Sequence, residues 1–281
     1  MIQTIELLPV FVDLTQKYPS LIFWKHFERA LSGKGDVDSI APRCELACIS
    51  RSFRELAFAK IPQVYAILES SYLENTKMNF VITHGNFPKL LEFDIGSIQS
   101  RLGIAWALPE KLIEFTTINQ YGVRVLKPGS QSVVLLVLYA LNRRGENKLS
   151  RNDYDELLSG IRSDYQSCMK TIESLFPPKL SEPLFRVVNF LYHGHWDSVA
   201  IRKAWRSVFL AGISQLLLNP VRMWKALKGK KREFFLHFSH RLSIDRETKF
   251  ASVDNLLRYY AKKSKYKVFV RASKNSFIEV E

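Results

Sequence analysis

Apolar residues in the first half of the chain fall into short runs separated by polar turns. Buried strands of a small sheet show this pattern, because each strand needs only a few apolar positions. A turn or short helix is expected at 26–31, an amphipathic helix at 50–60 and another short helix at 101–108. The runs that predict strands lie at 21–25, 37–41, 63–68, 79–83, 89–95 and 122–126.

The pattern changes after Pro128-Gly129, where longer apolar stretches begin. Residues 130–141 are one continuous run, and its length together with the exit through Gly145 favours a helix over a strand. A C-terminal hairpin is expected from 266–272 and 276–280. Further helices are expected at 152–158, 162–175, 182–192, 198–218, 221–227 and 252–263.

Together these elements predict an α+β protein. Residues 1–128 are expected to form a domain around a small mixed β-sheet. Residues 129–281 are expected to form a mostly helical, basic domain that ends in the β-hairpin.

Charge is distributed unevenly along the chain. Residues 1–100 hold 10 Lys/Arg and 11 Asp/Glu, a net charge of −1, so the remaining part carries +15 and accounts for the whole net charge of +14. The excess peaks at 198–232, with nine basic residues and no acidic one. Such a half predicts a polyanionic partner, namely RNA, DNA, a polyphosphorylated substrate or an anionic membrane surface; the alternative is a basic surface that serves solubility.

Composition also limits where the protein acts. Three cysteines do not make a disulfide scaffold and favour a reducing compartment. No apolar segment approaches the ~20 residues that span a bilayer, and no basic leader precedes an apolar stretch. We therefore predict a cytoplasmic protein without a transmembrane segment.

Two carboxylates one residue apart are the most informative local feature. Asp36 and Asp38 follow the Gly33-Lys-Gly35 turn, at the start of an expected strand. Residues i and i+2 of a strand share a face, so the two anions would repel each other unless a cation lay between them. Oxygen ligands of this kind suit Mg²⁺ beside substrate phosphates. The alternative is an ordinary surface turn, for which the same residues are common.

The order of these features resembles the DNA polymerase β-type nucleotidyltransferase superfamily, and within it the minimal bacterial nucleotidyltransferase-like proteins. The likeness rests on Trp24-Lys25, on Gly33-Lys-Gly-Asp-Val-Asp38 and on a later strand carrying Asp94, and it covers residues 20–145. It implies that Asp36, Asp38 and Asp94 are metal ligands and catalytic residues, with Asp94 also activating the acceptor hydroxyl. Gly33 and Gly35 would lie at the nucleotide.

One departure from that family concerns the phosphate site. The superfamily carries Gly-Ser or Gly-Gly at the end of the first strand, whereas this chain has Trp24-Lys25-His26. Lys25 is expected to replace the backbone amides as a point charge on a phosphate. The alternative is a nucleotide site that is altered or lost.

Several further residues are candidates for substrate contact. His84 follows a strand shortly before Asp94, and a structural loop histidine is its alternative role. In the basic half, aromatic residues alternate with positive charge, which suits RNA, an anionic membrane or an ordinary bundle helix. The residues expected to hold the acceptor are Arg143, Arg144, Arg222 and Lys225.

The predicted function is Mg²⁺-dependent transfer of a nucleotidyl group from an NTP to a hydroxyl of RNA. The resemblance extends to tRNA-modifying toxins of toxin–antitoxin modules, which leaves open an inhibitory protein partner. It also leaves open an acceptor from a polysaccharide pathway. A catalytically silent fold that binds polyanions or other partners is the alternative. Which NTP and which acceptor are used, and the oligomeric state, do not follow from the sequence.

Overall fold

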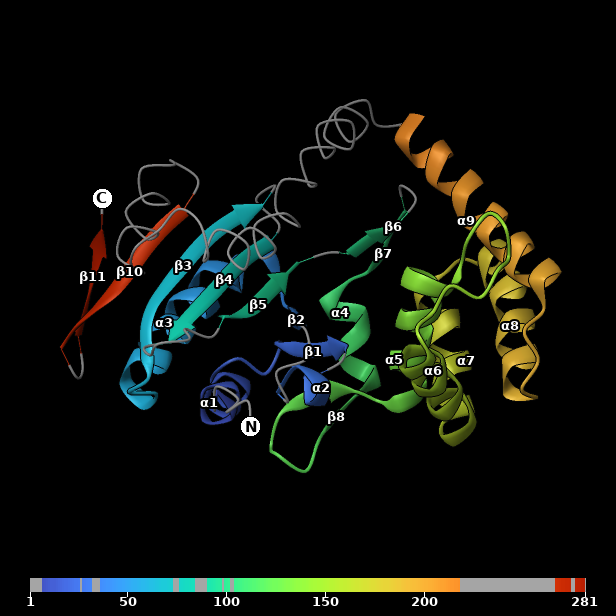
Figure 1. Ribbon diagram of the computed structural model, residues 1–281. Helices are drawn as coiled ribbons and strands as arrows, with labels where there is room; N and C mark the ends of the chain where they lie inside the picture. The colour runs from blue at the N-terminus through green and yellow to red at the C-terminus, as the bar shows by residue number, and fades with distance from the viewer. Residues whose placement is uncertain are drawn as a thin grey trace, which may run out of the picture.

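The computed structural model describes residues 7–25, 27–31, 36–72, 76–83, 90–97, 99–101, 104–217, 266–273 and 276–280. It confirms the predicted α+β class, with a mixed sheet built by the N-terminal part and a mostly helical part after it (Figure 1). The helices expected at 221–227 and 252–263 lie outside the described residues. The division into two domains near residue 128 stays a prediction.

Nine strands of the described chain form one sheet in the order β11-β10-β3-β4-β5-β2-β1-β9-β8. Most neighbours are antiparallel, but β2 with β5 and β1 with β9 are parallel. The bounds are β1 Ile22–Lys25, β2 Val37–Ile40, β3 Val64–Tyr72, β4 Thr76–Thr83, β5 Leu90–Gly96, β8 Thr116–Ile118, β9 Arg124–Leu126, β10 Tyr266–Ser273 and β11 Ser276–Val280.

The helix expected at 101–108 is wrong. The chain there forms β6 (Gln99–Arg101) and β7 (Ile104–Ala107), which pair as a separate two-stranded sheet. Trp106 explains the difference, because it is buried against Trp24 and Phe176, with ring centroids 6.4 and 5.9 Å away. Burial of this ring outweighs the weak local helical period.

An aromatic-rich core fills one face of the large sheet. It lies beneath α1 (Leu8–Lys17) and α3 (Leu46–Lys60), which cover that face. Fully buried rings from the helices and the strands meet there, with centroids 4.6–6.0 Å apart. Each ring removes roughly 150–250 Å² from water, so this cluster is a main source of stability. The rings are those of Phe11, Phe23, Phe53 and Phe93.

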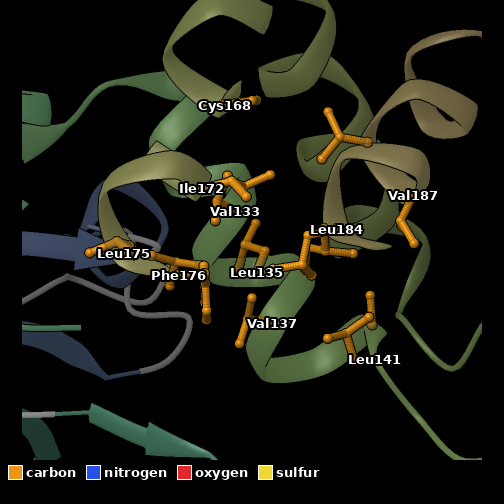
Figure 2. Packing of buried hydrophobic residues seen from close by; sticks show 14 of the residues in the cluster. Val133, Leu135, Val137, Leu141, Cys168, Ile172, Leu175, Phe176, Leu184 and Val187 are labelled. Carbon is orange, nitrogen blue, oxygen red and sulfur yellow. The ribbon is translucent and has the colours of Figure 1, made fainter. Parts of the chain in front are cut away.

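A second core joins the opposite face of the sheet to the helical part. Apolar residues of α5 (Pro128–Leu135) and of its π-helical continuation (Leu136–Ala140) lie at its centre, between α7 (Tyr165–Leu175) and α8 (Pro178–Tyr192) (Figure 2). Ile22, Trp24 and Ile40 contribute to it from the sheet. The remaining helices are α2 Phe27–Leu31, α4 Pro109–Leu112, α6 Arg151–Ser163 and α9 Ser198–Leu217, with short 3₁₀ turns at Arg43–Glu45 and Ile113–Phe115.

The C-terminal hairpin belongs to the N-terminal sheet. Although β10 follows the helical part in the chain, it pairs antiparallel with β3 at the edge of that sheet. Arg271 anchors it to α3, since its guanidinium donates to the carbonyl oxygens of Phe58, Ile61 and Val64 at 2.6, 2.9 and 2.8 Å. Phe58 lies in the last turn of α3, where backbone acceptors lack helical partners, Ile61 follows the helix and Val64 begins β3.

We expect Arg271→Leu to lower the free energy of unfolding by about 2–3 kcal/mol, because three carbonyl oxygens lose a charged donor. Chemical denaturation monitored by circular dichroism measures this change. The matched control is Lys267→Leu on the same strand, whose side chain is 64% exposed and lies 3.3 Å (Nζ to Oε1) from Glu279. Equal losses from both substitutions would contradict the anchoring role.

A buried ionic network crosses the edge of the first core. The carboxylate of Glu69 on β3 accepts from Arg54 at 2.7 Å, from Lys77 at 3.0 Å and from Ser50 at 3.0 Å. The Arg54 guanidinium also lies over the Phe269 ring of β10, 3.7 Å from its centroid. One carboxylate therefore links α3, β3 and β4, and through Arg54 it reaches the hairpin.

Burial raises the pKa of the Glu69 carboxyl, but the hydrogen bond and charge of Lys77, with Ser50 and Arg54, outweigh it and hold the pKa below its ordinary value. A lowered folded-state pKa stabilises the fold above the unfolded-state pKa, and this contribution is lost as the pH falls through the folded value.

We therefore expect Glu69→Gln to cost about 3 kcal/mol at neutral pH, the lower end of the range for a broken buried pair, because Lys77 is 24% exposed. The loss should shrink as the pH falls below the ordinary range of glutamate, where wild-type Glu69 also takes up a proton. Urea unfolding over a pH series tests this, with the exposed Glu182→Gln as control. If the stability lost by Glu69→Gln stayed the same as the pH was lowered, the role of the ionised carboxylate would be contradicted.

Candidate active site

The parallel pairing of β2 with β5 brings two of the predicted carboxylates together. Asp38 on β2 lies opposite Asp94 on β5 in the register, and Ser39 donates to the carbonyl oxygen of Asp94 at 2.9 Å. Neighbouring strands of a sheet lie about 4.8 Å apart, and residues level with each other share a face. Residues 56 positions apart in sequence numbering (94 − 38) thus become direct neighbours.

The face that carries these carboxylates is the one that meets the helical part. Alternation along β2 places Asp38 with Ile40, which belongs to the second core, whereas Val37 belongs to the aromatic core. Both carboxylates are half-buried, and Oδ1 of Asp94 is shielded from solvent. Partial burial strengthens the repulsion between two like charges, because water screens them less.

Asp36 and Glu92 stand one step further along the same two strands. Asp36 is exposed and precedes β2 by one residue, so it lies level with Glu92, the residue before Phe93. Alternation along β5 places Glu92 on the face of Asp94, whereas Asp36 lies before the start of β2. Glu92 is not among the predicted site residues, although the alternation of Leu91, Phe93 and Ile95 with acidic residues is the sequence signal for its shared face with Asp94.

Carboxylate oxygens are the ligand type that a hard cation such as Mg²⁺ prefers, but few of them are grouped here. Within the residues that the structure describes, no three side chains of His, Cys, Asp and Glu are grouped so that they could hold a metal ion. Asp38 and Asp94 form a pair across two strands. Mg²⁺ is commonly held by one or two carboxylates, with water and substrate phosphates supplying the other oxygens. The pair therefore fits Mg²⁺ that arrives with a phosphorylated ligand, and Asp36 as a third ligand stays a prediction.

Buried aromatic side chains lie beside Asp38 and Asp94, on the side of β1. Trp24 is 1% exposed, and its ring packs with Trp106 and then Phe176. The pairing of β1 with β2 is irregular here: Phe23 lies opposite Ser39, Lys25 lies opposite Asp38, and Trp24 falls at the bulge between them. The large ring occupies this end of β1, next to the position of Lys25.

The other candidate residues are distributed over the molecule. The backbone of Lys25 lies opposite Asp38, in line with Asp94, while its side chain is outside the described part. Arg143 and Arg144 are exposed on a loop beside α9, apart from β2 and β5 (Figure 1). The residues that fall outside the described ranges are Gly33, Gly35, His84, Arg222 and Lys225.

Comparison with known proteins adds little. No family model and no curated protein matches the sequence. Among solved structures, the crystal structure of the Megavirus polyadenylate synthase is similar, with a TM-score of 0.36 and 14% sequence identity. The match covers 59% of this chain and only 33% of the viral chain. At this TM-score the likeness carries no weight for function.

None of the helices that the structure describes is long and apolar enough to cross a membrane.

We expect Asp94→Asn to raise the melting temperature in the presence of EDTA, because opposed like charges cost about 0.2–1 kcal/mol. Adding Mg²⁺ with an NTP should raise the melting temperature of the wild type but leave that of the variant unchanged. Differential scanning fluorimetry measures both effects, and Asp155→Asn on the exposed face of α6 is the control. A variant that is less stable than wild type in EDTA would contradict repulsion at this pair.

Proposed function

We propose that this protein is a Mg²⁺-dependent nucleotidyltransferase that moves a nucleotidyl group from an NTP to a hydroxyl of RNA. The observation that carries the proposal is the register of β2 and β5, which sets Asp38 level with Asp94. Two half-buried carboxylates in adjacent strands offer oxygen ligands from two directions, and oxygen-only ligands of this kind favour Mg²⁺ with phosphates.

Asp38 and Asp94 are the residues that would hold the metal, and Asp36 would join them when a nucleotide is bound. The bound metal would neutralise phosphate charge and make the acceptor hydroxyl more acidic. Asp38 lies on β2, between β1 and β5, so it would contact the ligand at the centre of the site. Lys25, in line with it along the backbone, would add one positive charge toward the phosphates.

The transfer itself is an in-line displacement at the α-phosphorus of the NTP. A lone pair of the acceptor oxygen forms the new P–O bond, and the bond to the bridging oxygen of pyrophosphate breaks. The hydroxyl proton passes to the carboxylate of Asp94, and pyrophosphate leaves with the electron pair of the broken bond. This role suits Asp94 because one of its oxygens is shielded from water.

The basic half supports RNA as the acceptor. The part of the chain after residue 100 carries a net charge of +15, and its described helices pack against the sheet face that carries the carboxylates. A tRNA end is one such acceptor, and a protein partner that restrains the activity would fit the same proposal. A sugar acceptor would not use so large a basic surface.

A second candidate function is favoured by Trp24. Its buried ring stands where backbone amides cradle phosphates in the similar superfamily. A chain with this replacement could keep the fold and bind polyanions without transferring a nucleotide. Here Asp38 and Asp94 would take no part in phosphate chemistry.

The two candidates are separated by incubating the protein with each α-³²P-labelled NTP, Mg²⁺ and total cellular RNA, protein and lipid. We expect label in RNA with at least one NTP, and a drop of about 10²-fold or more with Asp38→Asn, since a metal ligand supplies several kcal/mol. Asp155→Asn is the matched control. Label in no fraction, with RNA binding retained, would favour the silent module.

A further inference from the structure

The loop after the π-helical turn is built as a rigid platform. The amide of Asn142 donates to the carbonyl oxygens of Ala140 and Glu146 at 3.0 and 2.7 Å. Its side-chain oxygen accepts from the backbone N–H groups of Arg144 and Glu146 at 3.1 and 3.3 Å. One side chain therefore closes the loop and holds Arg143 and Arg144 on its exposed edge.

Gly145 joins this loop to the start of α9. It has a φ of +71°, and a Cβ at this position would lie 2.3 Å from the carbonyl oxygen of Ser198 and 3.0 Å from Cγ of Arg202. The carbonyl oxygen of Gly145 also accepts from the indole N–H of Trp196 at 2.8 Å. Only glycine fits a contact this close, so the loop and the helix are held directly against each other.

The outer stripe of α9 continues the positive charge from this contact. Arg202, Lys203 and Arg206 are exposed at helical spacing, while their neighbours Ile201 and Ala204 are buried. The helix supplies no acidic side chain to this stripe. The acidic residue of the adjoining loop is Glu146, whose carboxylate oxygens lie 3.9 Å from Nη1 of Arg144 and 3.8 Å from Nζ of Lys148. Both ion pairs are exposed, so each contributes little free energy.

We propose that this loop–helix surface, made of Arg143, Arg144, Arg202, Lys203 and Arg206, binds the phosphodiester backbone of RNA. The inference rests on the proposed function in taking the acceptor to be RNA, and it assigns where that acceptor is held. Arginine predominates, and its planar guanidinium matches phosphate with two parallel hydrogen bonds. Contacts to the backbone position a strand without reading its sequence.

An anionic membrane is the competing partner for a basic helix. A helix that lies in a membrane interface buries a continuous apolar face, with basic residues along its border. Here the basic residues occupy the middle of the exposed stripe, and the apolar faces of Ile201, Ala204 and Val208 already pack in the protein core. The exposed apolar residues Val199, Leu210 and Ile213 lie before and after the basic segment and form no continuous apolar face with it. The surface thus fits a flexible polyanion better than a lipid layer.

The test is fluorescence anisotropy with a labelled single-stranded RNA of mixed sequence, measured over a range of salt concentrations. The variant Arg143→Gln/Arg144→Gln/Lys203→Gln/Arg206→Gln should bind RNA at least about tenfold more weakly. Its salt dependence should also be shallower, by about 0.7 in the log–log slope for each lost contact. Arg202 is retained because its Nε donates to Ser198 and its stem packs on Gly145.

The matched control removes the same number of charges from other exposed positions, with Arg151→Gln/Lys170→Gln/Lys179→Gln/Arg186→Gln. Its affinity for RNA should stay within about twofold of the wild type. Gly145→Ala keeps every charge but forces the loop away from α9, so it should also weaken binding when circular dichroism shows a folded protein.

Equal losses in the quadruple variant and the control, or a loss of binding to anionic phospholipid vesicles with RNA binding intact, would overturn the assignment. Failure of the proposed function is distinguishable from this result. A protein that transfers no label but binds RNA through these four residues would contradict the catalytic proposal and still support the RNA-binding surface.

Discussion

The parallel pairing of β2 with β5 decides what the acidic residues of this chain can do. A shift of one residue in this register would turn Asp38 toward the aromatic core and Val37 toward the helical part. Val37, Phe93 and Ile95 are fully buried on the aromatic side. Burial of each such side chain contributes about 1.5–3 kcal/mol, whereas opposed carboxylates cost about 0.2–1 kcal/mol. The hydrophobic face therefore sets the register, and the carboxylates stand opposite each other as a result.

The sheet works as a middle layer between two cores with different tasks. The aromatic core beneath α1 and α3 fixes the strands, and the Glu69 network holds β10 and β11 to the far edge. The second core attaches the helices to the face that carries Asp38 and Asp94. In this arrangement, the helical part offers a basic surface on α9 while its apolar side stays in the core. Catalytic and acceptor-holding roles would thus belong to separate layers of one fold.

The sequence predicts the local elements better than their partners. The alternation of Leu91, Phe93 and Ile95 with acidic residues identifies β5 and its two faces, and the apolar run at 130–141 identifies the central helix. The helix at Leu8–Lys17 is not predicted from the sequence, since Leu7 gives no side-chain cap at its start. The strand pair β6–β7 was mistaken because the burial of Trp106, a long-range contact, determines it. The placement of the hairpin beside β3 and the parallel register of β2 likewise depend on contacts between distant residues.

The central claim is that Asp38 and Asp94 act on one shared divalent ion. Electron paramagnetic resonance of Mn²⁺, titrated into the protein with a non-hydrolysable NTP analogue, measures that binding directly. The account predicts one tight Mn²⁺ class in the wild type, a large loss with Asp38→Asn or Asp94→Asn alone, and little further loss when both are replaced, because neither carboxylate holds the ion without the other. Small, additive losses from the two substitutions, or no Mn²⁺ binding by the wild type, would contradict it.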